Sequence, residues 1–125
     1  MHVPSFRRQE RELFEMAMML EGYLHKKSTR YLVGHQRKYF QVIANGAYLA
    51  YYDKQPKGTV GKEIVPNGVF FITQMTDIDT LSGSKFQFVY NQRAFQFETG
   101  KPIEAKLWVI CLQFLNKHAR DCMIS

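Results

Sequence analysis

The basic residues of this chain are concentrated in one region. Between Gly22 and Lys62 the sequence holds eight basic residues and a single acidic one, Asp53. The basic residues are Lys26, Lys27, Arg30, Arg37, Lys38, Lys54, Lys57 and Lys62. The whole chain carries a net charge of +6, so this region holds the entire positive excess. Such a concentration predicts an anionic partner, either a membrane surface or a nucleic acid. The alternative is a solvated basic face that keeps the protein soluble.

An apolar tripeptide lies inside the basic region. Tyr31, Leu32 and Val33 are flanked by cations within Ser28–His35, a segment whose composition indicates a loop. Apolar side chains at a loop tip favour shallow insertion into a bilayer, with the flanking cations at the lipid headgroups. Alternatively, Leu32 and Val33 extend a strand and pack inward.

Other groups of reactive side chains do not match known sites. Cys111, His118 and Cys122 lack a fourth ligand and the spacing of a zinc site. Asp77 and Asp79 are not part of a recognisable calcium-binding loop. No nucleophile–base pair stands out. We therefore expect no metal, no cofactor and no enzymatic activity.

The elements that must position these residues are mainly strands, in a chain of 125 residues, the size of one domain. Alternating apolar and polar residues between turn signals predict seven short strands. They span residues 22–27, 37–44, 47–52, 59–64, 69–74, 86–90 and 95–97. Asn45-Gly46 predicts a tight turn with positive φ at both residues, and a second hairpin is expected to turn at Asn91-Gln92. Strands this closely spaced predict an antiparallel β-sandwich or partly open barrel.

A helix is predicted on each side of the strands. Residues 6–20 have helical periodicity, with Ser5 as a possible N-cap. We expect this helix to pack four apolar residues against the domain or a second copy. These residues are Leu13, Met16, Ala17 and Leu20. Residues 103–118 form an amphipathic pattern that predicts a C-terminal helix, capping an open end of the sheet and burying Trp108.

Several segments resemble those of a known family. The sequences EGYLHKK at Glu21–Lys27 and RKYFQVI at Arg37–Ile43 resemble the first two strands of pleckstrin-homology (PH) domains. Tyr48–Asp53, followed by the sequence KGTV at Lys57–Val60, is similar to the third strand and the start of the fourth. Trp108 lies in the closing helix, as in the family. The resemblance covers most of the chain and implies two packed antiparallel sheets closed by a helix.

The resemblance also implies a phosphoinositide site at the open mouth around the first inter-strand loop. It assigns Lys26, Lys38 and Lys57 as phosphate-binding cations and Tyr51 as a hydroxyl donor. A headgroup this densely charged needs several converging cations. Gln36 stands where the family carries a basic residue, so we expect weaker or less selective binding. With two neighbouring cations, the expected headgroup-binding set is Lys26, Lys27, Arg30, Gln36, Lys38, Tyr51 and Lys57. Arg37 is expected to face the other side of its strand.

We therefore expect a cytoplasmic, peripheral membrane adaptor that binds phosphoinositides or other acidic lipids. The expected organisation is a helical extension at residues 1–20, a PH domain at residues 21–118 and a tail at residues 119–125. The alternative is a protein–protein interaction module on a PH-like fold, with weak or no lipid binding and with the N-terminal helix as a possible partner surface. Nucleic acid is not an expected partner, because the basic residues gather at one mouth instead of alternating with aromatic residues along a groove.

Overall fold

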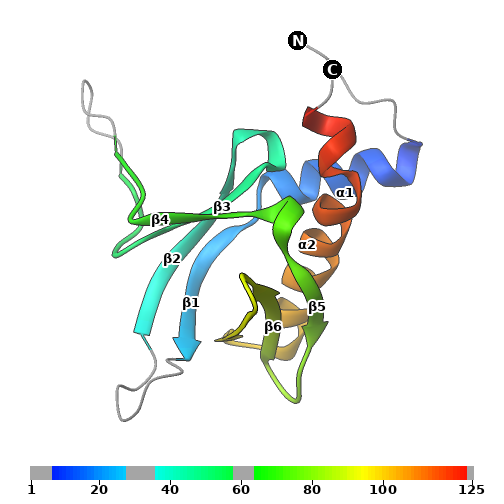
Figure 1. The fold of residues 1–125 in the computed structure, drawn as a ribbon. Coiled ribbons are helices and arrows are strands. Elements are labelled where there is room, and N and C mark those ends of the chain that lie inside the picture. Colours follow the sequence, from blue (N-terminus) through cyan, green and yellow to red (C-terminus); the bar gives the residue numbers. More distant parts are fainter. Residues whose placement is uncertain (1–6, 28–35, 58–63, 124–125) are drawn as a thin grey trace.

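The computed structural model describes residues 7–27, 36–57 and 64–123 (Figure 1). Two helices flank seven strands. In chain order they are α1 (Arg8–Met18), β1 (Glu21–Lys27), β2 (Gln36–Ile43), β3 (Tyr48–Tyr52), β4 (Gly68–Phe71), β5 (Thr76–Thr80), β6 (Lys85–Tyr90), β7 (Arg93–Glu98) and α2 (Pro102–Met123). Short 3-10 turns follow β2, at Ala44–Gly46, and β4, at Ile72–Gln74.

All seven strands belong to one antiparallel sheet, in the order β4-β3-β2-β1-β7-β6-β5. β1 joins its two halves. It pairs with β2 along most of its length, and with β7 only at its end, through His25, Lys26 and Lys27. The sheet curves strongly, with α2 packed along it (Figure 1). The predicted mainly β fold, with seven antiparallel strands and a helix on each side, is confirmed. The strands form one continuous sheet instead of two separate ones.

The two ends of the sheet, β4 and β5, are consecutive in the chain but are not paired with each other. A side chain bridges the gap between the two halves at this point. The backbone N–H of Phe71, in β4, donates a hydrogen bond of 3.1 Å to the hydroxyl of Tyr90, in β6. The barrel is therefore open but held across its seam.

The strand boundaries differ from the prediction in this part of the sheet. β4 ends at Phe71, and residues 72–74, predicted as strand, form a 3-10 turn. The sequence does not predict β5, because Ile78 is its single buried residue and the strand lacks an apolar alternation. The strand predicted at residues 59–64 lies almost entirely outside the described residues.

The hairpin between β2 and β3 is longer than predicted. Ile43 pairs with Tyr48, so four residues form the loop instead of Asn45-Gly46 alone. Asn45 and Gly46 have the expected positive φ, at 54° and 89°, but Ala44 shares it at 55°. A Cβ atom on Gly46 would lie 2.8 Å from Leu115 Cδ2 in α2. The longer loop therefore packs tightly under the closing helix, a contact that the local sequence cannot reveal.

The hairpin between β6 and β7 turns at Asn91-Gln92, as predicted. Tyr90 pairs with Arg93, and the two turn residues have φ of 50° and 65°. This two-residue turn fixes the start of β7 at Arg93.

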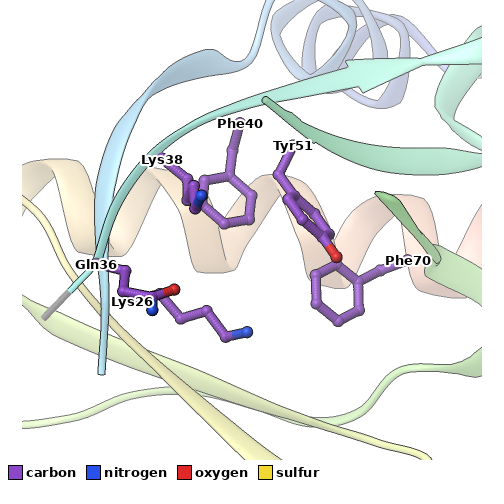
Figure 2. Close-up of a pocket in the computed structure, with 6 residues that line it drawn as sticks. All are labelled: Lys26, Gln36, Lys38, Phe40, Tyr51 and Phe70. Atoms are coloured by element: carbon purple, nitrogen blue, oxygen red, sulfur yellow. The ribbon is translucent and has the colours of Figure 1, made fainter. Parts of the chain in front are cut away.

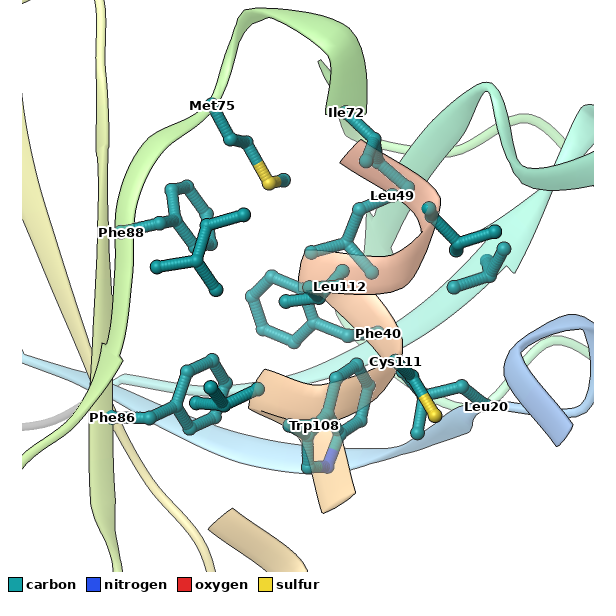
Figure 3. Packing of buried hydrophobic residues seen from close by; sticks show 14 of the residues in the cluster. Leu20, Phe40, Leu49, Ile72, Met75, Phe86, Phe88, Trp108, Cys111 and Leu112 are labelled. Carbon is teal, nitrogen blue, oxygen red and sulfur yellow. The ribbon is translucent and has the colours of Figure 1, made fainter. Parts of the chain in front are cut away.

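α2 buries its apolar face against the sheet (Figure 3). Trp108 is only 5% exposed, and its ring stacks on Phe86 with centroids 6.0 Å apart, which confirms the predicted burial. Cys111 is fully buried in the same core, and burial raises the pKa of its thiol to about 11. α2 continues to Met123, so residues 119–123, expected in a tail, are helical.

α1 packs against α2 with much of the predicted face. Ala17 is buried, and Leu13 packs against the core. α1 ends at Met18, so Leu20, predicted inside the helix, follows it and is buried there. The prediction for Met16 is wrong, since this side chain is 45% exposed. Phe14 packs against the core in its place, because the contact stripe is centred nearer to Ala17 and turns Met16 toward solvent.

Polar groups fix the beginning of α1. The helix starts at Arg8, and the backbone N–H of Arg7 donates a hydrogen bond of 3.2 Å to the Glu10 carboxylate. Ser5, the predicted N-cap, lies outside the described residues. On α2, His118 Nε2 lies 3.4 Å from Glu10 Oε2. α1 is thus held on the domain by both apolar and polar contacts.

A pair of substitutions in α1 tests whether this helix is part of the folded unit. Ala17→Arg forces a charged side chain into a full core and should lower the free energy of unfolding by about 2–4 kcal/mol. Met16→Arg, on the exposed side of the same helix, should change it by less than about 0.5 kcal/mol. Chemical denaturation measures both. Equal effects of the two variants would contradict the docking of α1.

Candidate anion-binding site

A pocket of about 190 Å³ lies on the inner side of strands β1–β4 (Figure 2). Side chains from four neighbouring strands line it. They are Lys26 of β1, Gln36, Lys38 and Phe40 of β2, Tyr51 of β3 and Phe70 of β4. Four of the expected headgroup-binding residues therefore meet in one cavity: Lys26, Gln36, Lys38 and Tyr51.

Strand alternation explains which residues reach the pocket. Gln36, Lys38 and Phe40 lie two apart on β2 and share its inner side. Arg37 lies between them and faces the outer side, as predicted, where its guanidinium carbon lies 3.8 Å from the centroid of the Tyr23 ring. Arg37 therefore contributes to the outer face and not to the pocket.

Tyr51 forms one wall of the pocket through a close packing arrangement. Its ring centroid lies 5.8 Å from that of Phe40 and 5.7 Å from that of Phe70. Gly68 is opposite Tyr51 in the β3–β4 ladder, and a Cβ atom on Gly68 would lie 2.6 Å from Tyr51 Cζ. Only glycine leaves room for the ring, so Gly68 determines where the Tyr51 hydroxyl lies.

Lys26 is held in a positively charged and partly dry environment. Its Nζ lies 5.0 Å from the centroid of the Phe95 ring. The pKa of Lys26 is lowered from its ordinary value, first by burial and then by the positive charges of Arg93 and Lys38. The ammonium form of Lys26 is thus less favourable than that of an exposed lysine, and a bound anion would favour it.

Arg93 is a cation that sequence reasoning missed. It begins β7, and its guanidinium carbon lies 5.4 Å from the centroid of the Phe95 ring that Lys26 also contacts. Arg93 alternates with Phe95 and Phe97, which places the three on the same side of the strand. This alternation was visible in the sequence, but the predicted strand began at residue 95 and left Arg93 out.

Lys38 has an acidic partner at the rim of the pocket. Its Nζ donates a hydrogen bond to Asp53 Oδ1 in a close ion pair. The side chain of Lys38 is 26% exposed and that of Asp53 is 66% exposed, so the pair lies at the border with solvent. The hydrogen bond from Lys38, followed by one from the Asn67 side chain, lowers the pKa of the Asp53 carboxyl.

Comparison with known proteins identifies the architecture. No family model and no curated protein matches the sequence. Among solved structures, the N-terminal PH domain of human ARAP2 is 23% identical, covers 80% of each chain and has a TM-score of 0.62. The PH domain of human oxysterol-binding protein-related protein 11 is 18% identical, covers 85% of each chain and has a TM-score of 0.65. This chain has the PH fold. The C-terminal PH domain of pleckstrin, in complex with D-myo-Ins(1,2,3,4,5)P5, is also similar, at 21% identity over 77% of this chain and 95% of that one, with a TM-score of 0.59.

Of the remaining predicted site residues, the structure describes the side chain of Lys57 alone. Lys57 is exposed and does not line the pocket. The reason is the path of the chain after β3, where the backbone N–H of Gln55 donates to the Tyr23 hydroxyl at 3.0 Å on the outer face. Lys27 ends β1, but its side chain is not described. Arg30 and the tripeptide Tyr31, Leu32 and Val33 lie outside the described residues.

No metal or membrane-spanning element is found among the parts of the PH fold that the structure describes. Groups of three or more histidine, cysteine, aspartate or glutamate side chains able to hold an ion do not occur among those residues. No described helix is long and apolar enough to cross a bilayer.

The fit between Gly68 and Tyr51 can be tested by a double-mutant cycle. Gly68→Ala should lower the free energy of unfolding by about 1–3 kcal/mol, because the new methyl group overlaps the Tyr51 ring. In a Tyr51→Ala background the same change should cost much less, since the ring is gone. Chemical denaturation of the four proteins gives the coupling energy. Additive effects would show that the ring does not lie over Gly68.

Proposed function

We propose that this PH-fold domain is a peripheral membrane adaptor, and not an enzyme, that binds phosphoinositides or other acidic lipids with their headgroup in the pocket between Lys26 and Lys38. The observation that carries the proposal is the convergence of these two lysines on one cavity. Arg93, outside the lining, contacts the same Phe95 ring as Lys26. The pleckstrin domain solved with an inositol pentakisphosphate has the same fold, which supports this class of ligand. We propose a cytoplasmic location, where such headgroups are displayed.

The donors around the pocket suit a phosphorylated ring. Lysine ammonium groups and the Arg93 guanidinium form charge-assisted hydrogen bonds with phosphate oxygens. The Gln36 amide and the Tyr51 hydroxyl are neutral donors that can fix the orientation of the ring. The pKa of Lys26 is lowered by burial and then by repulsion from Arg93 and Lys38, and a bound anion would offset both effects.

Lys38 should be the most informative residue for lipid binding. Hydrogen bonds to charged groups contribute about 1.5–3 kcal/mol, so Lys38→Ala should weaken binding about tenfold or more. The control is Lys117→Ala, which removes the same charge from an exposed position on α2. Co-sedimentation with phosphatidylcholine liposomes, with and without phosphoinositides, measures both variants. A similar loss in the two would indicate binding by overall charge and would contradict a pocket.

The apolar loop tip is proposed to add a second, uncharged contribution. Screening shortens from about 10 Å at 0.1 M salt to about 3 Å at 1 M, so purely electrostatic binding should collapse across this range. If Tyr31, Leu32 and Val33 insert, part of the affinity should survive high salt, and Leu32→Asp should remove that part. Lys38→Ala should leave it. Liposome co-sedimentation across a salt series measures the difference, and a Leu32→Asp variant that matches wild type at every salt concentration would exclude insertion.

A protein-interaction module is the second candidate function. Val69 and Phe71 of β4 are 36% and 40% exposed, and an apolar edge of this kind is suited to a protein partner. α1, the other surface considered for a partner, is docked on α2 and buries Ala17. A wild-type protein that binds none of the liposomes would favour this candidate over the lipid pocket.

A further inference from the structure

A carboxylate lies at the rim of the pocket, paired with one of the lysines that line it. Asp53 is the first residue after β3, and its carboxylate accepts a hydrogen bond from Lys38, one of the two lysines that line the cavity. The charges around this site are thus the two lysines that line the cavity, Lys26 and Lys38, the neighbouring Arg93, and one carboxylate at the rim. Any phosphate that approaches Lys38 must share it with Asp53 or displace that side chain.

Contacts on both sides keep Asp53 at the rim. The preceding residue, Tyr52, is buried on the outer face of the sheet. Two residues further on, the Gln55 backbone is bound to the Tyr23 hydroxyl. The chain on either side of Asp53 is therefore anchored, and the carboxylate can leave Lys38 by side-chain rotation but not by withdrawal of the loop. The hydrogen bond from Lys38 lowers the pKa of Asp53 further below its ordinary acidic value, so the carboxylate is charged at neutral pH.

The Asp53 carboxylate should affect the binding of singly and multiply phosphorylated rings to different extents. Lys26 of β1 and Arg93 of β7 contact the same Phe95 ring, at 5.0 Å and 5.4 Å from its centroid. We expect a single phosphate to bind beside these two cations, away from the ion pair of Lys38 with Asp53. A second or third phosphate on the same ring must extend toward Lys38, where it meets the negative charge of Asp53. The phosphate and the Asp53 carboxylate are both negative and repel each other, and the repulsion grows with each phosphate added.

We propose that Asp53 is a specificity-determining residue of the pocket, which disfavours multiply phosphorylated headgroups and leaves a preference for a ring that carries one phosphomonoester. The inference rests on the proposed function and names the ligand class for the same site. The ligand chemistry is common to a membrane lipid and to a free inositol phosphate. Because Asp53 is largely exposed, water weakens its field, and the discrimination should be modest.

Asp53→Asn tests the proposal, because it removes the charge and retains the size of the side chain. Titration calorimetry with soluble inositol monophosphate, bisphosphate and trisphosphate measures the affinities of wild type and variant. The variant should bind the trisphosphate about threefold to tenfold more tightly, and the monophosphate less than about twofold more tightly. Vesicles that contain phosphatidylinositol with one, two or three additional phosphates form the second arm of the experiment.

The matched control is Glu12→Gln, which removes one negative charge from an exposed position on α1. It should leave the ratio of trisphosphate to monophosphate affinity unchanged. A thermal unfolding curve for each variant establishes that it is folded. If Glu12→Gln changes the ratio as much as Asp53→Asn does, net charge explains the effect and the assignment of Asp53 is wrong.

The remaining outcomes separate this inference from the proposed function. If wild type and Asp53→Asn bind neither soluble headgroups nor vesicles, the proposed function fails and the inference fails with it. If wild type binds and Asp53→Asn keeps the same ratio of affinities, only the role of Asp53 is overturned. A change of ratio with vesicles but not with soluble headgroups also overturns it, because the effect would then arise at the membrane surface instead of in the pocket.

Discussion

The short pairing of β1 with β7 is the constraint on which the rest of the structure depends. It joins strands β2–β4 and strands β5–β7 into one sheet through three residue pairs. The central pair sets Lys26 opposite Phe97 and so brings the Lys26 ammonium group to the ring of Phe95. Lys26 of the first strand and Arg93 of the last strand contact the same Phe95 ring because of this pairing. The pocket is therefore a product of sheet topology as much as of the basic segment between Gly22 and Lys62.

Aromatic side chains pack across the gap between the two end strands of the sheet, which no strand pairing closes. The sheet ends at β4 and β5 without joining, yet Phe70 of β4 contacts Phe88 of β6 and Phe95 of β7 at centroid distances of 5.1 and 5.2 Å. Edge-to-face contacts of this kind add stability beyond the burial of the rings. The same Phe70 lines the pocket, and Phe95 contacts both Lys26, which lines it, and the neighbouring Arg93. The core that holds the two halves together is thus continuous with the wall of the candidate site.

Local sequence patterns predicted the features that depend on neighbouring residues. Strand alternation placed Lys38 inward and Arg37 outward, and helical period placed Trp108 in the core. The sequence does not predict β5, because polar residues surround its one buried residue, Ile78. The pairing of β5 with β6 depends on the tertiary fold. The ion pair between Lys38 and Asp53 joins neighbouring strands through side-chain geometry that no local pattern contains. The exposure of Met16 likewise depends on the angle at which α1 meets α2.

The hydrogen bond between Phe71 and Tyr90 bears on how this domain behaves at high concentration. The end strand of an open sheet presents unpaired backbone groups that can template pairing with another chain and start polymerisation. β4 is only four residues long, and one of its N–H groups is already occupied by the Tyr90 hydroxyl. An incoming strand would have to break this bond before it could extend the sheet. The tyrosine that spans the seam therefore also protects the domain against edge-to-edge aggregation, and a protein partner at β4 would have to recognise side chains such as Val69 instead of adding a strand.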